Sequence, residues 1–226
     1  ESVISFDKDF PKLSGNHVIL MVPTEKETIW LENTSQKIAF NHLSYSSHNR
    51  NVLAVKENGI EIIDTPVYKP EESKEKIMAK IKLAEDDSID LKFFNMNNDE
   101  IQEALKNRHY HLKIDQLKIQ NLTNNRDDAK IVYDLNFKAN GFSKKIGNDL
   151  FFPVMPYYSA VTFSGNDERK LPFETAFPFQ DDYEIEYSIP EGYKFSEIPK
   201  SSEINTEFGS YTINYNLKDG KLLVHR

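Results

Sequence analysis

Two side chains near the start of the 226-residue sequence are of types that could perform acid–base chemistry. His17 begins one apolar run, and Glu32 ends the next. We expect these runs to pair as a hairpin with Val22 opposite Ile29, because a polar loop of hairpin length separates them. In that register His17 is a diagonal neighbour of Glu32 on one face of the hairpin. Diagonal neighbours lie about 7–8 Å apart at the backbone, which a glutamate and an imidazole can span.

A carboxylate held against His17 would give the imidazole the properties of an enzymatic base. It would fix the ring tautomer and stabilise the imidazolium, as in enzymes with a Cys-His-Asp site. On spacing alone, the more common arrangement is an ordinary histidine at a strand end beside a solvated glutamate. The sequence contains no cysteine, so it offers neither a thiol nucleophile nor a thiolate zinc site. It also lacks the Gly-x-Ser-x-Gly pattern of a serine nucleophile.

Other polar residues give weaker indications of a site. His109 and His111 would share a face on a strand, but no third ligand accompanies them, so we expect a surface pair and no metal site. Three acidic pairs lack the spacing of a calcium-binding loop and are interpreted as solvated turns: Asp86-Asp87, Asp127-Asp128 and Asp181-Asp182.

An aromatic cluster is the candidate for a binding site. Phe151, Phe152, Tyr157 and Tyr158 lie close together with prolines among them. They could form a stacking platform for a glycan or a surface for a peptide. Such a cluster is more often part of a β-sandwich core with a packed loop, and both interpretations stay open.

The composition describes an ordinary globular chain and limits its partners. The hydrophobic fraction is 38% and the net charge is −8, which argues against nucleic acid and anionic membrane as partners. No apolar run approaches the roughly 18 residues of a membrane span. The sequence predicts no cofactor.

Alternating apolar residues predict a mainly β chain with antiparallel strands. They recur with a period of two over 77–83, 131–137, 183–189 and 211–217, which is typical of strands with one buried face. Asn58-Gly59 and Asp219-Gly220 predict hairpin turns. One short helix is expected over 101–108, after a polar cap. We place a boundary near residue 68, between a β-rich first domain (1–68) and a C-terminal β-sandwich (69–226).

Several segments, in this order, resemble bacterial transglutaminase-like proteins, which carry domains of unknown function on either side of a catalytic core. The earlier segments resemble the end of that core, and the later ones resemble the C-terminal β domain. The segments are 10–20, 28–36, 49–55, Gly59, Thr65-Pro66, Asp182-Tyr183, 189–193 and 208–211.

The resemblance implies a role for each residue of the pair. His17 falls at the catalytic histidine of the family, and Glu32 falls where many members have the aspartate that orients it. The catalytic cysteine would lie upstream, so this chain alone would be catalytically incomplete and would have the upstream part of its own polypeptide as partner. The resemblance also implies a periplasmic or extracellular location. If residues 1–66 are part of a larger core, we expect Val18, Leu20 and Val22 to be solvent-facing. The alternative is a non-catalytic module that binds a glycan, a peptide or a neighbouring domain.

Overall fold

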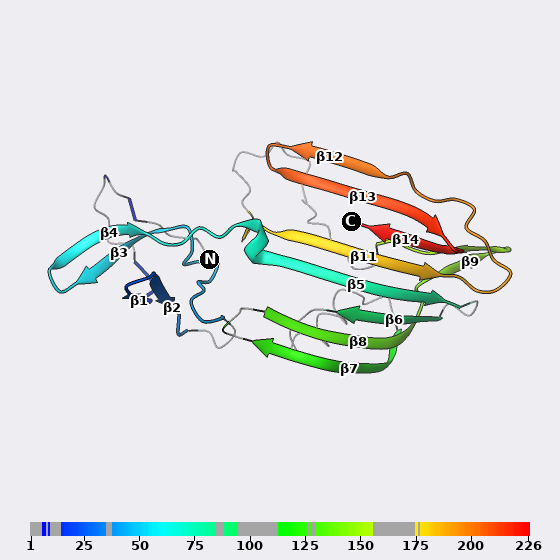
Figure 1. The fold of residues 1–226 in the computed structure, drawn as a ribbon, viewed down its shortest axis with the longest axis horizontal. Coiled ribbons are helices and arrows are strands. Elements are labelled where there is room, and N and C mark those ends of the chain that lie inside the picture. The colour runs from blue at the N-terminus through cyan, green and yellow to red at the C-terminus, as the bar shows by residue number, and fades with distance from the viewer. Residues whose placement is uncertain are drawn as a thin grey trace. The chain divides into compact units, whose positions relative to one another are not determined.

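The computed structural model describes residues 6–7, 9, 15–34, 38–84, 88–94, 113–125, 127, 130–155, 175 and 177–226. It divides into two compact units (Figure 1). The first comprises Glu1–Lys74 with Asn125–Lys130 and Phe173–Gln180, and the second comprises the remainder. The chain is mainly β with antiparallel pairing, as the sequence predicts. The expected helix over 101–108 lies outside the described residues, and the described helical segment is the 3₁₀ turn η1 (Pro70–Ser73).

The first unit contains two hairpins, β1–β2 and β3–β4. The predicted register of the first is confirmed, because Val22 of β1 (Leu20–Pro23) pairs with Ile29 of β2 (Thr28–Leu31). The second joins β3 (Asn51–Lys56) to β4 (Gly59–Asp64) through a two-residue turn, Glu57-Asn58. The turn predicted at Asn58-Gly59 is therefore displaced by one residue, because Gly59 pairs with Lys56 as the first residue of β4. A small core of Trp30, Leu43 and Tyr68 holds this unit together.

The second unit is built on an eight-stranded sheet with the order β12-β13-β14-β11-β5-β6-β8-β7. A small hairpin, β9–β10, accompanies it. The strands are β5 (Lys74–Leu83), β6 (Ser88–Phe94), β7 (Lys113–Asn125), β8 (Lys130–Asn140), β9 (Lys144–Ile146), β10 (Asp149–Phe151), β11 (Gln180–Ser188), β12 (Ser202–Thr206), β13 (Gly209–Lys218) and β14 (Lys221–His225).

The core of the second unit follows the alternating residues that the sequence shows. The buried side chains come from every second position of β5 and β11, joined by residues of β8, β13 and β14. Leu150, Phe152 and Phe195 pack against them from outside the large sheet. In the described part of this unit eight strands form one sheet and β9 and β10 form a separate two-stranded sheet, and the assignment of residues 69–226 to a sandwich stays a prediction. Alternation shows that a strand has one buried face, but it does not assign strands to layers.

No helix in the described part of the chain is long and apolar enough to cross a membrane.

The turn between β13 and β14, at the right-hand end of the sheet in Figure 1, can be tested by mutation. Asp219 and Gly220 both have positive φ, at 50° and 73°, as a two-residue hairpin turn requires. Replacing Gly220 by alanine should lower the free energy of unfolding of this unit by about 1 kcal/mol, because an L side chain is strained there. Urea unfolding followed by far-UV circular dichroism measures the change. The exposed Asn216→Ala variant is the control, and equal stability of the two variants would contradict the assigned turn.

Candidate functional site

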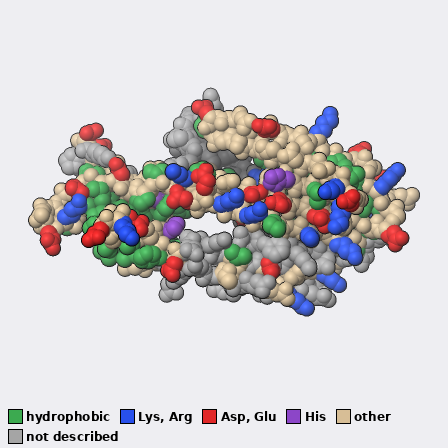
Figure 2. Space-filling view, in the orientation of Figure 1, with side chains coloured by type: hydrophobic (Ala, Val, Ile, Leu, Met, Phe, Trp, Pro, Cys, Tyr) green, Lys and Arg blue, Asp and Glu red, His purple; other side chains and the backbone are tan. Residues whose placement is uncertain are grey.

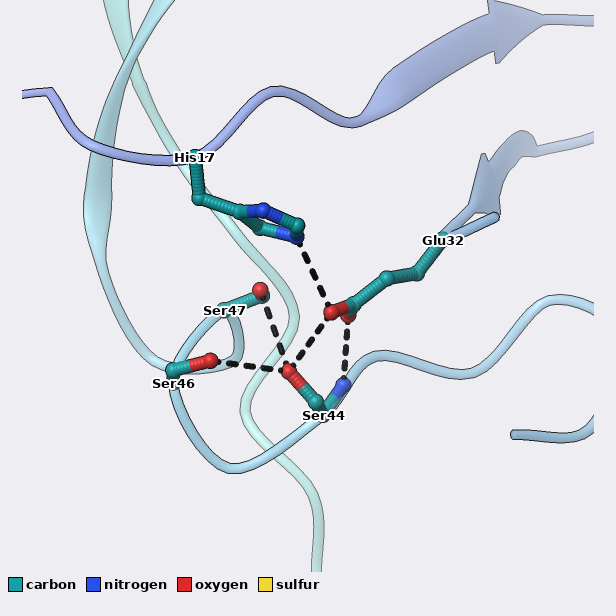
Figure 3. Close-up of polar contacts among 5 residues, drawn as sticks. All are labelled: His17, Glu32, Ser44, Ser46 and Ser47. Atoms are coloured by element: carbon teal, nitrogen blue, oxygen red, sulfur yellow. Dashed lines mark hydrogen bonds and ion pairs between the residues drawn. The ribbon is translucent and has the colours of Figure 1, made fainter. Parts of the chain in front are cut away.

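His17 and Glu32 come together beyond the open end of the β1–β2 hairpin. His17 lies in the extended segment before β1, and Glu32 follows the last residue of β2. The imidazole Nε2 is 3.1 Å from Glu32 Oε1. Figure 3 shows the ring directed at the carboxylate, with its other nitrogen turned away from it. The hairpin register thus brings the pair into hydrogen-bond contact, as the sequence predicts, while the catalytic role of the pair stays a prediction.

Ser44 completes the surroundings of Glu32, and the sequence analysis missed it. The Ser44 backbone N–H donates to Glu32 Oε2 at 2.7 Å, and the Ser44 hydroxyl donates to Oε1 at 2.8 Å (Figure 3). Ser46 and Ser47 place their hydroxyls 3.0 and 3.2 Å from that of Ser44. The serine-rich stretch 44–47 is visible in the sequence. However, no periodic pattern relates it to Glu32, because it lies in a loop.

The loop that carries Ser44 is anchored in the core of the first unit. The Leu43 backbone N–H donates to the Tyr68 hydroxyl at 2.6 Å. The backbone N–H groups of Ser47 and His48 both donate to the Ser44 carbonyl, each at 3.0 Å, and close a tight turn. His48 is buried and stacks on Phe177 with ring centroids 4.5 Å apart. Ser44 is therefore held from both sides of its position in the chain.

The site keeps a buried negative charge beside a partly accessible imidazole. The Glu32 side chain is only 3% exposed, whereas that of His17 is 32% exposed. Burial raises the pKa of the Glu32 carboxyl, but hydrogen bonds from Ser44, His17 and Ser47 outweigh burial and hold the pKa below its ordinary value of 4.5. Glu32 is therefore ionised at neutral pH, in the state that an orienting carboxylate needs.

This lowered pKa predicts a pH-dependent stability of the first unit. The folded-state pKa of Glu32 lies below the unfolded value of 4.5. The contribution of Glu32 to stability is therefore fully present above pH 4.5 and is lost as the pH falls through the folded-state value. Trp30 is the single tryptophan and lies in this unit's core, so its fluorescence reports the unit's unfolding in urea.

The comparison is between the wild-type chain and Glu32→Gln at about pH 6 and about pH 3. We expect the wild type to be more stable than Glu32→Gln at the higher pH. The difference between their free energies of unfolding should shrink at the lower pH. Glu57→Gln, in the exposed turn between β3 and β4, is the control. A difference between wild type and Glu32→Gln that stays constant with pH would contradict the assigned charge state.

The geometry can support base catalysis but supplies no nucleophile among the described residues. A proton on Nε2 donates to the ionised Glu32, which leaves the lone pair on Nδ1. The Ser44 hydroxyl donates its proton to the Glu32 carboxylate and therefore does not offer it to the imidazole. The arrangement is a partly accessible imidazole that a buried carboxylate orients.

Several apolar side chains of the first unit are exposed. Val18 is 84% exposed and Leu20 is 58% exposed, whereas Val22 is half-buried. On the β3–β4 hairpin, Val55 and Ile60 are cross-strand partners and both are exposed. Figure 2 shows hydrophobic side chains on the visible face of this unit. The exposure of Val18 and Leu20 agrees with the expectation for residues 1–66 as part of a larger core, whereas the half-burial of Val22 does not.

The aromatic candidates separate in the structure. Phe151 is exposed, whereas Phe152 packs in the core of the second unit, 5.0 Å from the Tyr187 ring and 6.4 Å from the Phe195 ring. Tyr157 and Tyr158 lie outside the described residues. One described member of the cluster is thus accessible to a ligand.

The remaining polar candidates divide between described and undescribed residues. His109, His111, Asp86-Asp87 and Asp128 lie outside the described part, while Asp127 is in a turn. The interpretation of Asp181-Asp182 as a solvated turn is wrong, because both residues belong to β11. Asp181 pairs with Arg226 at 3.3 Å, and Asp182 pairs with His225 at 3.1 Å. A polar pair at the start of a strand has the same local sequence as one in a turn.

Asp182 also belongs to a group of potential metal ligands. Its ligand atoms lie within 4.8 Å of those of Glu184 and His225. The ammonium of Lys76 lies 3.0 Å from Glu184 and 3.9 Å from Asp182. The hydrogen bond to Glu184 and the charges of both carboxylates raise the pKa of Lys76. Lys76 therefore already supplies the positive charge that a metal ion would bring.

Comparison with known proteins assigns part of the second unit. Residues 148–226 match the family described as a domain of unknown function with solved structure, DUF3858. Residues 148–226 form a DUF3858 domain. No curated protein and no solved structure matches the chain.

The DUF3858 domain contributes β10–β14, while β5–β8 come from the residues before it. In the sheet order, β11 of the DUF3858 domain is the neighbour of β5, so the two sets of strands complete one sheet. His17, Glu32 and Ser44 lie outside the matched range. The family match therefore does not assign their chemistry.

Proposed function

We propose that this chain is the C-terminal portion of a transglutaminase-like protein of the Cys-His-acid type. In this proposal His17 is the general base, Glu32 is the residue that orients it, and the cysteine comes from the upstream part of the same polypeptide. The observation that carries the proposal is the 3.1 Å contact of His17 Nε2 with a buried, ionised Glu32.

The chemistry follows from which ring nitrogen is occupied. Glu32 holds the proton on Nε2, so Nδ1 is the atom that can accept the proton of a thiol. The thiolate then attacks an amide carbonyl, and the imidazolium gives its proton to the leaving amine. Water or a second amine releases the acyl group from the resulting thioester. Glu32 stabilises the imidazolium in both half-reactions.

One further observation supports the proposal. The exposed Val18 and Leu20 lie on the segment that leads from His17 into β1, which is where the remainder of a catalytic core would pack. Because the sequence resembles bacterial transglutaminase-like proteins, the proposal also includes a bacterial origin and a periplasmic or secreted location.

The test compares this chain alone with the polypeptide that includes its upstream segment. Both are assayed for incorporation of a fluorescent primary amine into a glutamine-containing peptide and for peptide hydrolysis. We expect no turnover by the chain alone and measurable turnover by the longer polypeptide. Turnover by the chain alone that disappears in His17→Ala would overturn the proposal, because a nucleophile would then be present within these residues.

A further inference from the structure

One residue of the site, Ser44, binds both carboxylate oxygens of Glu32. A glutamate has one more methylene than an aspartate, so its carboxylate has an additional rotatable bond and can take more orientations. His17 contacts only Oε1 and does not by itself fix the carboxylate plane. Ser44 contacts both oxygens, with its backbone N–H on Oε2 and its hydroxyl on Oε1. Ser44 therefore holds both carboxylate oxygens at once, while His17 and Ser47 add further hydrogen bonds to Glu32.

We propose that Ser44 is a positioning residue that fixes Glu32 and, through Glu32, selects the tautomer of His17. This inference rests on the proposed function for its catalytic consequence, but not for its structural one. Ser44 touches neither the imidazole nor a reacting atom. It acts by placing the negative Oε1 where only a protonated Nε2 can meet it.

The hydroxyl network gives Ser44 a single orientation. A serine hydroxyl has one proton and two lone pairs. The ionised carboxylate of Glu32 accepts that proton at 2.8 Å, so the Ser46 hydroxyl, 3.0 Å away, is the donor to Ser44. Hydrogen bonds to an ionised acceptor are about twice as strong as neutral ones, which favours this direction. The proton of Ser44 is thus committed to Glu32 and does not compete for His17.

The backbone around Ser44 makes this arrangement rigid. Tyr68 accepts the N–H of Leu43, and its ring stacks on His42 with centroids 5.5 Å apart and planes 8° apart. Because Tyr68 is in the small core of the unit, the Ser44 N–H keeps its direction towards Oε2. Tyr68 therefore holds Ser44 in place and, through Ser44, helps to position Glu32.

The experiment measures the tautomer of His17 in this chain by ¹⁵N NMR of labelled imidazole, at a pH where the same spectra show the ring to be neutral. We expect the proton of the wild type to be almost entirely on Nε2. In Ser44→Ala the population should shift towards a mixture, and the carboxyl ¹³C titration of Glu32 should move to higher pH. Ser44→Thr, which keeps a hydroxyl, should restore both readings. Ser210→Ala, which removes an exposed hydroxyl from the sheet of the second unit, is the matched control.

Each outcome shows whether or not Ser44 positions Glu32. An unchanged tautomer and an unchanged Glu32 titration in a folded Ser44→Ala chain would overturn the proposal. If Ser44→Ala does not fold, Tyr68→Phe is read instead, and it should give a smaller shift in the same direction. No shift in that variant would equally overturn the proposal.

In the longer polypeptide, Ser44→Ala should lower kcat by about 10- to 100-fold with little change in KM. A misplaced base slows proton transfer in the transition state but does not alter substrate binding. A tautomer shift in the isolated chain without any His17-dependent turnover in the longer polypeptide would leave the positioning intact and contradict the proposed function. The two failures can therefore be told apart.

Discussion

Replacing His17 by alanine in the polypeptide that includes the upstream segment should lower kcat/KM for acyl transfer by about 100- to 10,000-fold. Without the imidazole, no described group can accept the thiol proton and return it to the leaving amine. The side chain is 32% exposed and, among the described residues, hydrogen-bonds to Glu32, so its removal should leave the fold intact. Steady-state kinetics with the amine-incorporation assay measure the loss.

The matched control is His225→Ala. His225 also contacts a carboxylate, that of Asp182 at 3.1 Å, but it belongs to the sheet of the second unit. We expect this variant to keep the wild-type rate. Equal losses in the two variants would show that a general effect on the protein, rather than the base at position 17, is being measured.

Replacing Phe137 by alanine should destabilise the second unit by about 3–5 kcal/mol. Phe137 is 2% exposed on β8 and belongs to the buried cluster formed with β5, β11, β13 and β14. Its removal leaves a cavity among Ile81, Leu83 and their neighbours, and the surrounding strands are held in register by the sheet. Urea unfolding followed by far-UV circular dichroism gives the free-energy change.

Phe208→Ala supplies the control for the same chemical change on the surface. Phe208 is 92% exposed in the β12–β13 turn, so its loss should change stability by less than about 0.5 kcal/mol. A small loss in Phe137→Ala, similar to that in Phe208→Ala, would contradict the assigned core.

Local pattern predicted much of this fold because strands and tight turns leave short-range evidence. Alternation identified β5 and β11, and Asp219-Gly220 located a turn in which both residues have positive φ. The order of the sheet could not be predicted in the same way. β5 neighbours β11, a strand about a hundred residues later, and nothing in either segment specifies the other.

The same distinction applies to the site. His17 and Glu32 flank one hairpin, so a register derived from the loop placed them within reach of each other, although the same spacing fits a solvated glutamate equally well. Ser44 reaches Glu32 from a loop whose path depends on Tyr68, and a loop has no periodicity to extrapolate. The polar pair Asp181-Asp182 was misassigned because the first residues of a strand and the residues of a turn can have the same polar types.

The most direct test of the central claim is the reactivity of the cysteine that His17 is proposed to serve. In the longer polypeptide, the rate of thiol alkylation by iodoacetamide is measured against pH, with His17 present and with His17→Ala. We expect a thiolate that forms below the ordinary cysteine pKa of about 8.5, and a return towards that value when His17 is removed. A thiol that titrates at the ordinary value and is insensitive to His17, or an upstream segment without a cysteine, would contradict the proposed function.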